Sequence, residues 1–295
     1  MTAFEGAGKG AGATLSCAGT VLDLSSPIVM GVLNVTPDSF SDGGLWMADG
    51  RPDLDALRRE ATAMVDAGAR ILDIGGESTR PGAVAVSEQQ ELDRVLPVFE
   101  ALRAETDAVL SLDSSTPAVM RAAASAGAGL LNDVRALQRD GALDTAAKLG
   151  LPVCLMHMQG APETMQNAPA YRDVVREVTE FLQDRANACI SAGLAQSQIV
   201  VDPGFGFGKT LEHNLVLLAQ LTRLRSLGFP IVAGLSRKSL IAKLTGRELE
   251  SRLPGSLALA MLAAQHGAVI LRVHDVAETT DVLRILQAVK DVHTP

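Results

Sequence analysis

The chain has 295 residues, of which 47% are hydrophobic and 20% charged, and its charged residues give a net charge of −8. This length and composition suit one large α/β domain or two ordinary ones, and they exclude a disulfide-stapled mini-protein, a collagen, a coiled coil and a disordered chain. The acidic balance gives no general attraction to nucleic acid or to an anionic membrane. No apolar run in the sequence is long enough to span a bilayer.

The first 20 residues are rich in glycine and alanine, and they lack the basic start and apolar block of a signal peptide. We expect residues 1–20 to be a disordered lead-in and residues 21–295 to form a single domain. The cysteines Cys17, Cys154 and Cys189 are odd in number and have no CxxC spacing, which predicts free thiols in a reducing compartment, by default the cytoplasm. Cys154 lies within an apolar run and is expected in the core.

Short apolar runs rich in β-branched residues alternate along the chain with segments that have helical spacing of apolar residues. The runs expected to be strands are Val29–Val35, Ile71–Ile74, Val109–Leu112, Gly129–Leu131, Pro152–Met156, Ile199–Val201, Ile231–Ala233 and Ala268–Leu271. The segments expected to be helices are Leu54–Asp66, Glu88–Ala104, Pro117–Ala126, Ala142–Leu149, Tyr171–Ala192, Leu211–Leu227, Leu253–Gln265 and Val276–Val289.

Strands that alternate with helices predict parallel β/α units, and eight such units predict a closed (β/α)₈ TIM barrel. An open, doubly wound sheet is the competing architecture. The length favours the barrel, for which about 250 residues is typical. Most of the expected helices are followed by a glycine suited to a left-handed helix end, namely Gly68, Gly127, Gly150, Gly193, Gly228 and Gly267.

In a parallel barrel the active site forms at the carboxyl ends of the strands, so the residues that end the apolar runs are informative. All eight ends are polar: Asn34, Asp73, Asp113, Asn132 with Asp133, His157, Asp202, Ser236 with Lys238, and Arg272 with His274. Helix capping explains a single member such as Asp133 or Ser236. The complete set indicates a ligand site.

The charges at these ends suggest the kind of ligand. Carboxylates such as Asp73, Asp113 and Asp202 can accept paired hydrogen bonds from a ring that carries N–H groups. Arg80, Lys238, Arg272 and His274 provide cations, and most of them follow the last two strands, where barrels of this type commonly bind phosphate. We therefore expect a phosphorylated heterocycle, whose ring the acids would also stabilise if it became cationic.

Two long loops, residues 34–50 and 75–88, follow the first two strands and are candidates for lids over the substrate. The segment Val201–Thr210 is glycine-rich, but Pro203 stands where a phosphate-binding loop needs glycine. It is better interpreted as a loop that lets the backbone approach a flat ligand, with Phe205 or Phe207 offering a ring to stack on. No HExxH or GxSxG motif supports a zinc hydrolase or a serine hydrolase.

Together these segments resemble the dihydropteroate synthase family over about residues 27–289. The matching motifs are MGVLNVTPDSFSDGG (30–44), DIGGESTRPG (73–82), LMHMQG (155–160), DPGFGFGK (202–209), LSRKS (235–239), PGSLA (254–258) and RVHDV (272–276). The resemblance implies a barrel enzyme that joins 6-hydroxymethyl-7,8-dihydropterin diphosphate to p-aminobenzoate and releases diphosphate. It also implies Mg²⁺ as cofactor, a homodimer, and small molecules as the substrates.

The resemblance further implies roles for individual residues, matched by position. Asp113, Asn132, Met156, Asp202 and Lys238 would bind the pterin, and Phe40, Thr79, Pro81, Phe207 and Ser239 would bind p-aminobenzoate. Asn34, Arg80, Arg272 and His274 would contact the diphosphate, with Asn34 also holding the metal and Asp42 an acid near the reacting centre. The catalytic set would be Asp113, Asp202, Lys238 and Arg272.

The expected chemistry is dissociative: diphosphate leaves, the dihydropterin ring delocalises the cation, and the neutral aniline attacks without a strong base. Two alternatives stay open from the sequence. One is a corrinoid-dependent methyltransferase with a similar folate-binding barrel, against which the LSRKS motif and the two substrate loops speak. The other is a non-catalytic pterin-binding paralogue, against which the diphosphate contacts Arg80, Arg272 and His274 speak.

Overall fold

The computed structural model describes residues 14–36, 47–48, 51–78, 86–161 and 164–292. Eight parallel strands close into a barrel in chain order, and the last strand pairs with the first. They are β3 (Ile28–Asn34), β6 (Ala69–Gly75), β7 (Val109–Asp113), β8 (Leu130–Asp133), β9 (Val153–Met156), β10 (Ile199–Asp202), β11 (Ile231–Ala233) and β12 (Ala268–Val273). The predicted (β/α)₈ barrel is thereby confirmed, and the open sheet is excluded.

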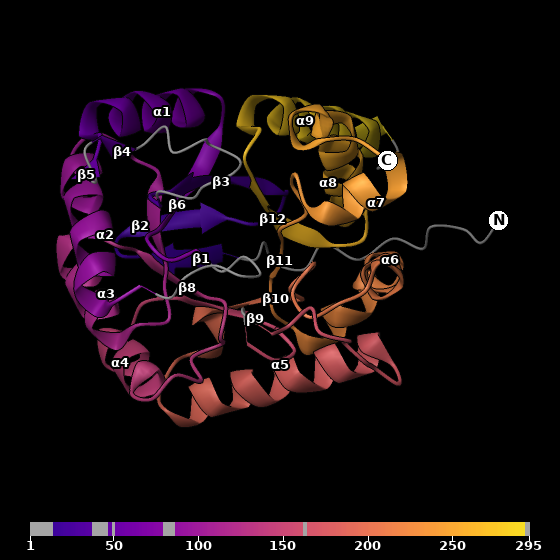
Figure 1. Ribbon diagram of the computed structural model, residues 1–295, viewed down its shortest axis with the longest axis horizontal. Helices are drawn as coiled ribbons and strands as arrows, with labels where there is room; N and C mark the ends of the chain where they lie inside the picture. Colours follow the sequence, from indigo (N-terminus) through magenta and orange to yellow (C-terminus); the bar gives the residue numbers. More distant parts are fainter. Residues whose placement is uncertain (1–13, 37–46, 49–50, 79–85, 162–163, 293–295) are drawn as a thin grey trace.

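Helices surround the barrel in chain order, from α1 round to α9 (Figure 1). They are α1 (Leu54–Asp66), α2 (Glu88–Leu102), α3 (Pro117–Ala126), α4 (Ala142–Leu149), α5 (Val174–Ser191), α6 (Leu211–Ala219), α7 (Ser239–Thr245), α8 (Leu253–Gln265) and α9 (Val276–Val292). Their apolar faces pack on the outer face of the barrel, and this layer is the main hydrophobic core. The six glycines expected at helix ends all have positive φ.

Two predicted elements differ from the structure. The helix expected over 211–227 is α6 followed by a 3₁₀ helix, Leu221–Leu227, because the backbone leaves the α conformation at Gln220 (φ −112°). The short helix α7 was missed, because its seven residues are too few to show a helical pattern. Two further 3₁₀ turns cover Gln196–Gln198 and Leu249–Ser251.

The amino-terminal end of the barrel is closed by an antiparallel hairpin, β1 (Thr14–Cys17) and β2 (Thr20–Asp23). Its buried side chains, with Leu24 after it, join a second core cluster that takes one apolar residue from each of the eight barrel strands. Leu15, Leu22, Leu24 and Cys17 meet Met30, Ile71, Val109, Leu130, Cys154, Val200, Val232 and Ile270 there. The disordered lead-in expected over residues 1–20 is therefore wrong for 14–20, while residues 1–13 lie outside the described part.

A second antiparallel pair, β4 (Met47–Ala48) and β5 (Arg51–Pro52), lies before α1. All three cysteines are free and buried, as expected, and Cys154 is part of the closed lower core. Within the described ranges, no helix is both long and apolar enough to cross a membrane. The barrel thus has a packed floor at one end, and its polar groups gather at the other.

Candidate active site

The strand register brings the polar ends of neighbouring strands into one layer. Asn34 pairs with Gly75, Gly75 with Asp113, and Asp113 with Asn132. A side-chain carbon added to Gly75 would lie 3.4 Å from Asp113 Cβ and 3.7 Å from Asn34 Oδ1, so both side chains border the space above this glycine. On the other side of the barrel, Asp202 pairs with Met156. The register thus places these strand ends at one rim of the barrel.

Asp73 lies below this layer and is fully buried. Its Oδ1 accepts from Ser111 Oγ (2.6 Å), and its Oδ2 accepts from Asn132 Nδ2 (2.9 Å) and Arg272 Nε (2.6 Å). With both oxygens used in this way, Asp73 is not the ligand-binding carboxylate that its place at a strand end predicted. It orients Asn132 and Arg272 instead, because a buried charge and its partners hold each other in fixed geometry.

Arg272 connects Asp73 with the rim, since its second guanidinium nitrogen donates to Asp113 Oδ2 at 2.8 Å. Burial, together with the nearby acids including Asp73, raises the pKa of Asp113 from 3.8 to about 7, although the Arg272 guanidinium acts to lower it. Burial opposes the charge of Arg272, but the carboxylates of Asp73 and Asp113 raise its pKa above the usual value. The guanidinium is therefore held permanently charged at the centre of the mouth.

Asp202 and Lys238 form the opposite side of the mouth. Burial raises the pKa of Asp202, while the positive charges of Lys238 and Arg272 act to lower it. Burial lowers the pKa of Lys238 to about 8, and Asp202 opposes this change. A side-chain carbon added to Gly234 would lie 3.8 Å from both Lys238 Nζ and Arg272 Cβ, so these two side chains lie close together at the mouth.

The glycine-rich loop after β10 carries both aromatic residues that the sequence offered for stacking. Phe205 is fully buried in the main core, so it offers no face to a ligand, and its carbonyl oxygen accepts from Lys238 Nζ. Phe207 is half-buried, and Lys238 Nζ lies 4.7 Å from the centre of its ring. Of these two rings only Phe207 is therefore accessible, and the Lys238 ammonium lies over it.

The remaining described candidates border the same mouth. Met156 ends β9 and is buried, and Ser239 is the exposed first residue of α7, directly after Lys238. His274 follows β12 and contacts Ser236 Oγ through its backbone nitrogen (3.2 Å) and Nδ1 (3.0 Å). The other candidates, Phe40, Asp42, Thr79, Arg80 and Pro81, lie outside the described residues.

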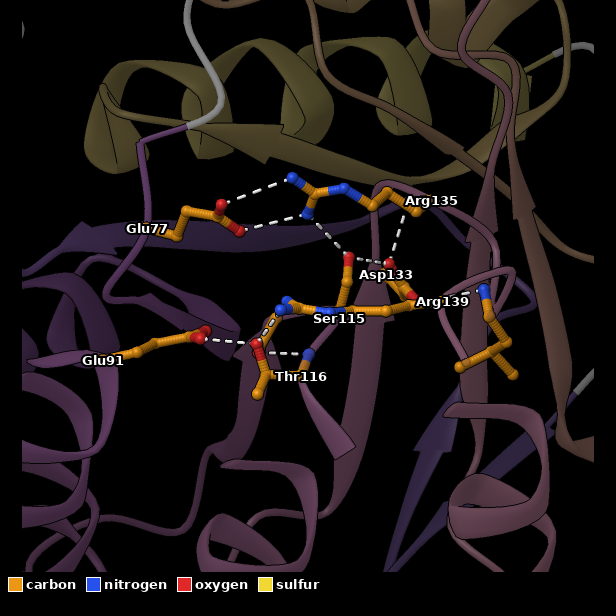
Figure 2. Close-up of polar contacts among 9 residues, drawn as sticks. Glu77, Glu91, Ser115, Thr116, Asp133, Arg135 and Arg139 are labelled. Atoms are coloured by element: carbon orange, nitrogen blue, oxygen red, sulfur yellow. Dashed lines mark hydrogen bonds and ion pairs between the residues drawn. The ribbon is translucent and has the colours of Figure 1, made fainter. Parts of the chain in front are cut away.

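Sequence reasoning missed a polar network that flanks the mouth beyond β7 and β8 (Figure 2). Arg135 forms two hydrogen bonds with the Glu77 carboxylate, at 3.0 and 3.3 Å, and a third with Ser115 Oγ, which donates to Asp133. Below it, Thr116 Oγ1 accepts from Arg139 (2.8 Å) and donates to Glu91 (2.7 Å). The network orders the chain on both sides of Asp113 and Asn132.

A cavity of about 400 Å³ opens beside this network, with Met156, Met158 and Phe181 on its apolar side. Asp133, which capping alone explained from the sequence, accepts from the backbone nitrogens of Arg135 (2.8 Å) and Leu137 (2.9 Å). The capping interpretation is therefore wrong for Asp133: the N-cap residue of α4 is Gly141, and the Asp133 carboxylate instead orders the turn that follows β8 and binds Ser115. Arg135 and Glu77 could have been suspected only from their place just after strand ends.

The described residues therefore define a barrel whose mouth is lined by two acids, a lysine, an arginine, an aromatic ring and an amide. These are Asp113, Asp202, Lys238, Arg272, Phe207 and Asn132. Such a mouth suits a flat ring with N–H groups joined to an anion. The model of the pterin binding enzyme family matches residues 30–274, so the chain belongs to that family of barrel proteins.

Within this family the chain belongs to the dihydropteroate synthases. It is 53% identical over 267 residues to the dihydropteroate synthase of Haemophilus influenzae, a match that covers 90% of this chain and 95% of that one. It is also similar to the Yersinia pestis dihydropteroate synthase in its sulfonamide complex (TM-score 0.91, 51% identity), with 94% of this chain and 99% of that chain covered. The chain is accordingly an enzyme, a transferase of this type.

A further solved relative is the dihydropteroate synthase of Xanthomonas albilineans with 4-aminobenzoic acid (TM-score 0.88, 52% identity), for which 96% of this chain and 100% of that chain are covered. The same enzyme has been solved in complex with 7,8-dihydropteroate. The resemblance expected from the motifs is confirmed over most of both chains.

Proposed function

We propose that the residues at this mouth condense 6-hydroxymethyl-7,8-dihydropterin diphosphate with p-aminobenzoate, forming 7,8-dihydropteroate and releasing diphosphate. The observation that carries the assignment of residues is the shared environment of Asp113, Asp202, Lys238 and Arg272, which come from four different strands or the loops that follow them. The complexes of the Xanthomonas relative with 4-aminobenzoic acid and with 7,8-dihydropteroate support the same substrates for this chain.

The pterin ring binds inside the mouth, and its edge is read by groups of opposite kinds. Asp113 and Asp202 accept from ring N–H groups, Lys238 donates to ring acceptors, and Asn132 offers its amide oxygen to the ring. Asn132 keeps its orientation because its amide nitrogen donates to Asp73. Met156, buried at the end of β9, packs on the ring.

The second substrate binds nearer the surface, where Phe207 and Ser239 offer an aromatic face and a hydroxyl. Phe40, Thr79 and Pro81 complete this site from the two loops after β3 and β6. The diphosphate meets Arg272, His274, Asn34 and Arg80. The guanidinium of Arg272 enters this contact already aligned by Asp73 and Asp113.

The chemistry begins with departure of diphosphate from the methylene carbon, whose C–O bond breaks with its electron pair going to the leaving oxygen. Arg272 stabilises the charge that develops on the diphosphate, and Asp113 and Asp202 stabilise the cation that spreads over the ring. The aniline nitrogen of p-aminobenzoate then forms the new C–N bond, and the proton that it loses passes to the released diphosphate or to water. Its lone pair is available at neutral pH, so no activated nucleophile of the protein is needed. Asp42 is assigned as an acid close to the reacting centre.

The residues at this mouth fit a Mg²⁺ ion that is held by one protein oxygen together with the diphosphate. Among the described residues no cluster of three or more His, Cys, Asp or Glu could hold a metal ion. The Asn34 amide oxygen, beside Gly75 and Asp113, is a single hard-oxygen donor. Mg²⁺ commonly takes one or two protein oxygens and completes its shell with substrate phosphates and water. Asn34 would therefore hold the ion together with the diphosphate, and the ion would neutralise charge on the leaving group.

We also assign a homodimer, formed through the face of α7, α8 and α9. Large apolar side chains are exposed there: Leu244, Met261, Leu262, Ile285, Val289 and Val292. A cluster of this kind on neighbouring helices is typical of an interface between proteins. Neither nucleic acid nor membrane is a partner in this assignment, and three buried free thiols suit the cytoplasm.

The function is tested by a coupled diphosphate-release assay with Mg²⁺ and both substrates, each substrate being omitted in turn. We expect release only when both are present, together with formation of dihydropteroate. Binding of the pterin in a calorimeter without turnover would identify a non-catalytic paralogue instead. Methyl transfer from a folate to a corrinoid protein would identify the methyltransferase alternative.

A further inference from the structure

Lys209 is a buried lysine that none of the steps above uses. It ends the glycine-rich loop after β10 and immediately precedes Thr210, the N-cap residue of α6. Only 2% of its surface is exposed, although lysine is among the residues that proteins bury least. An ammonium group removed from water is costly unless its protons are all hydrogen-bonded, so its position requires partners.

The partners of the Lys209 ammonium come from two strand ends. Its Nζ donates to the carbonyl oxygens of Gly204 (2.9 Å) and Phe207 (3.0 Å), both in its own loop. It lies 2.9 Å from His157 Nδ1 and 3.4 Å from the His157 carbonyl oxygen, at the end of β9. Three protons therefore meet an inward-facing set of acceptors, and the ammonium ties the loop after β10 to the neighbouring strand.

His157 is held in the state that accepts this bond. Burial and the positive charge of Lys209 lower the pKa of His157 to about 3, so the ring is neutral. A neutral ring that accepts at Nδ1 carries its proton on Nε2. The ring also packs edge-on against Phe181, with 4.9 Å between the ring centres. His157 is thus a buried polar group whose ring nitrogen is hydrogen-bonded, and its partner is Lys209.

The loop itself is shaped so that its carbonyls can reach Lys209. Gly204, Gly206 and Gly208 all have positive φ. A side-chain carbon on Gly204 would lie 1.9 Å from the His157 carbonyl oxygen, and one on Gly208 would lie 2.4 Å from the Gln159 carbonyl oxygen. Only glycine permits this close approach of two backbones, and a backbone of so many glycines has little stiffness of its own.

The other side of the same loop carries the substrate-binding groups. The Gly204 backbone nitrogen donates to Asp202 Oδ1 (2.7 Å), the Phe205 carbonyl accepts from Lys238 Nζ, and the Phe207 ring lies under that ammonium. Asn214 Oδ1 accepts from the Gly206 nitrogen at 2.7 Å and fixes the loop from the α6 side. Lys209 thus holds, from beneath, a loop whose upper side contacts both Asp202 and Lys238.

We propose that Lys209 is a positioning residue of this enzyme: its ammonium, braced by His157, fixes the loop 203–208 in the shape that presents the Phe207 ring to p-aminobenzoate. This inference rests on the proposed assignment of Phe207 to the p-aminobenzoate site. Lys209 touches no substrate in it. The effect of losing its charge should therefore appear first in the affinity for the second substrate.

The test uses the full chain with Lys209→Met, which keeps much of the length of the side chain and removes its three donors. We expect KM for p-aminobenzoate to rise by about tenfold or more and kcat to fall by a similar factor, since small displacements of binding groups cost this much or more. KM for the pterin diphosphate should rise by a smaller factor, because two of its proposed binding groups, Asp113 and Asn132, are positioned by Arg272 and Asp73 rather than by the loop.

Val178→Ala provides the matched control for plain destabilisation. Val178 is a fully buried core residue of α5 and lies in no part of the substrate site. We expect its Tm to fall and its KM values to stay at those of the unaltered enzyme. If the control reproduces the rise in KM for p-aminobenzoate, the effect is one of stability and Lys209 has no positioning role.

Lys209→Arg keeps the test decisive if the methionine variant does not fold. Arginine retains the charge, but its planar donors cannot match the acceptors of a compact ammonium, so we expect the same selective rise in KM at smaller size. Constants within about twofold of the unaltered enzyme in a folded variant would overturn the inference. Failure of the unaltered enzyme to form dihydropteroate would instead overturn the proposed function, so the two outcomes are distinguishable.

Discussion

Arg272 Nε donates to Asp73 Oδ2 across 2.6 Å, although the two residues lie 199 positions apart in the chain. The bond joins β12 to β6, the two strands that flank β3 in the barrel, and the same guanidinium also reaches Asp113 at 2.8 Å. Asp73 is fully buried, so it can contact substrate only through the groups that it orients. The acid deepest in the mouth therefore sets the direction of the cation proposed to receive the leaving group.

Asp73→Asn tests this relationship. The amide keeps the shape but loses the charge that balances Arg272, and breaking a buried ion pair typically costs about 3–5 kcal/mol of the free energy of unfolding. We expect a loss near the lower end of that range, measured in denaturant, because Asp113 still pairs with Arg272, and a fall in kcat of about tenfold. The exposed acid Asp55, which pairs with Arg58 on α1, provides the control: Asp55→Asn should cost at most about 1 kcal/mol. Equal effects of the two substitutions would contradict the role of Asp73.

Asp202→Asn tests the assignment of the ring-stabilising acid. The amide can still hydrogen-bond to the ring, but it cannot stabilise a developing cation as a carboxylate does. We expect kcat to fall by about two or more powers of ten, with a much smaller change in pterin affinity. The measurement is steady-state turnover together with calorimetric titration of the pterin. Undiminished turnover would remove Asp202 from the mechanism.

Gly204→Ala tests whether the close approach of the loop to β9 is required. An added carbon would lie 1.9 Å from the His157 carbonyl oxygen, which belongs to backbone and cannot swing away. Gly150, which ends α4, is a matched control, because its φ of +63° is close to the +68° of Gly204 and no atom lies within 4 Å of its added carbon. Gly150→Ala should cost about 1–2 kcal/mol for the left-handed backbone alone. Gly204→Ala should cost about 1–3 kcal/mol more in thermal or denaturant unfolding, because it also overpacks the loop. Similar losses would show that the loop can move away without cost.

The fold could be predicted because each β/α unit has a recognisable local pattern of apolar residues. Helices α1, α3, α4 and α8 begin and end where apolar spacing, caps and glycines placed them. The hairpin Thr14–Asp23 was not predicted, because its strands are four residues long and the first lies in a Gly/Ala-rich region. Its apolar residues are buried only because they close the end of a barrel whose strands come later in the chain.

The sequence predicts which residues belong to the site, but not which of them hydrogen-bond to one another. A strand end shows that Asp73 faces the mouth region, but not that Ser111, Asn132 and Arg272 occupy its oxygens. The same limit applies to Lys209, because the glycine-rich segment GFGFGKT gives no reason to expect a buried lysine. Choice between Phe205 and Phe207 likewise depends on which ring the turn of the loop directs into the core. Such choices follow from packing across several strands, which no local pattern records.

The proposed dimer interface on α7–α9 is tested by introducing a charged residue into it. Ile285 on α9 is 66% exposed, and an aspartate there would be buried without a partner if two copies meet on this face. We expect the unaltered protein to sediment as a dimer and Ile285→Asp to sediment as a monomer at micromolar concentration. Val21 is 60% exposed on the hairpin beneath the barrel, so Val21→Asp should leave the sedimentation coefficient unchanged. If the unaltered protein sediments as a monomer, the proposed homodimer is wrong.

Stability toward acid should depend on His157. Its pKa is lowered from 6.5 to about 3 by burial and by Lys209, so the folded protein keeps the ring neutral where the unfolded chain protonates it. The unfolded state then binds more protons, and the stability present above pH 6.5 is lost as the pH falls toward 3. The loss attributable to this one group approaches about 1.4 kcal/mol per pH unit well below 6.5. His157→Gln keeps an acceptor for Lys209 and removes the titration, so its free energy of unfolding should fall less steeply between pH 6.5 and pH 4.5. Equal slopes for the two proteins, or an imidazole that titrates near pH 6.5 by NMR, would show that the His157–Lys209 contact does not keep the ring neutral.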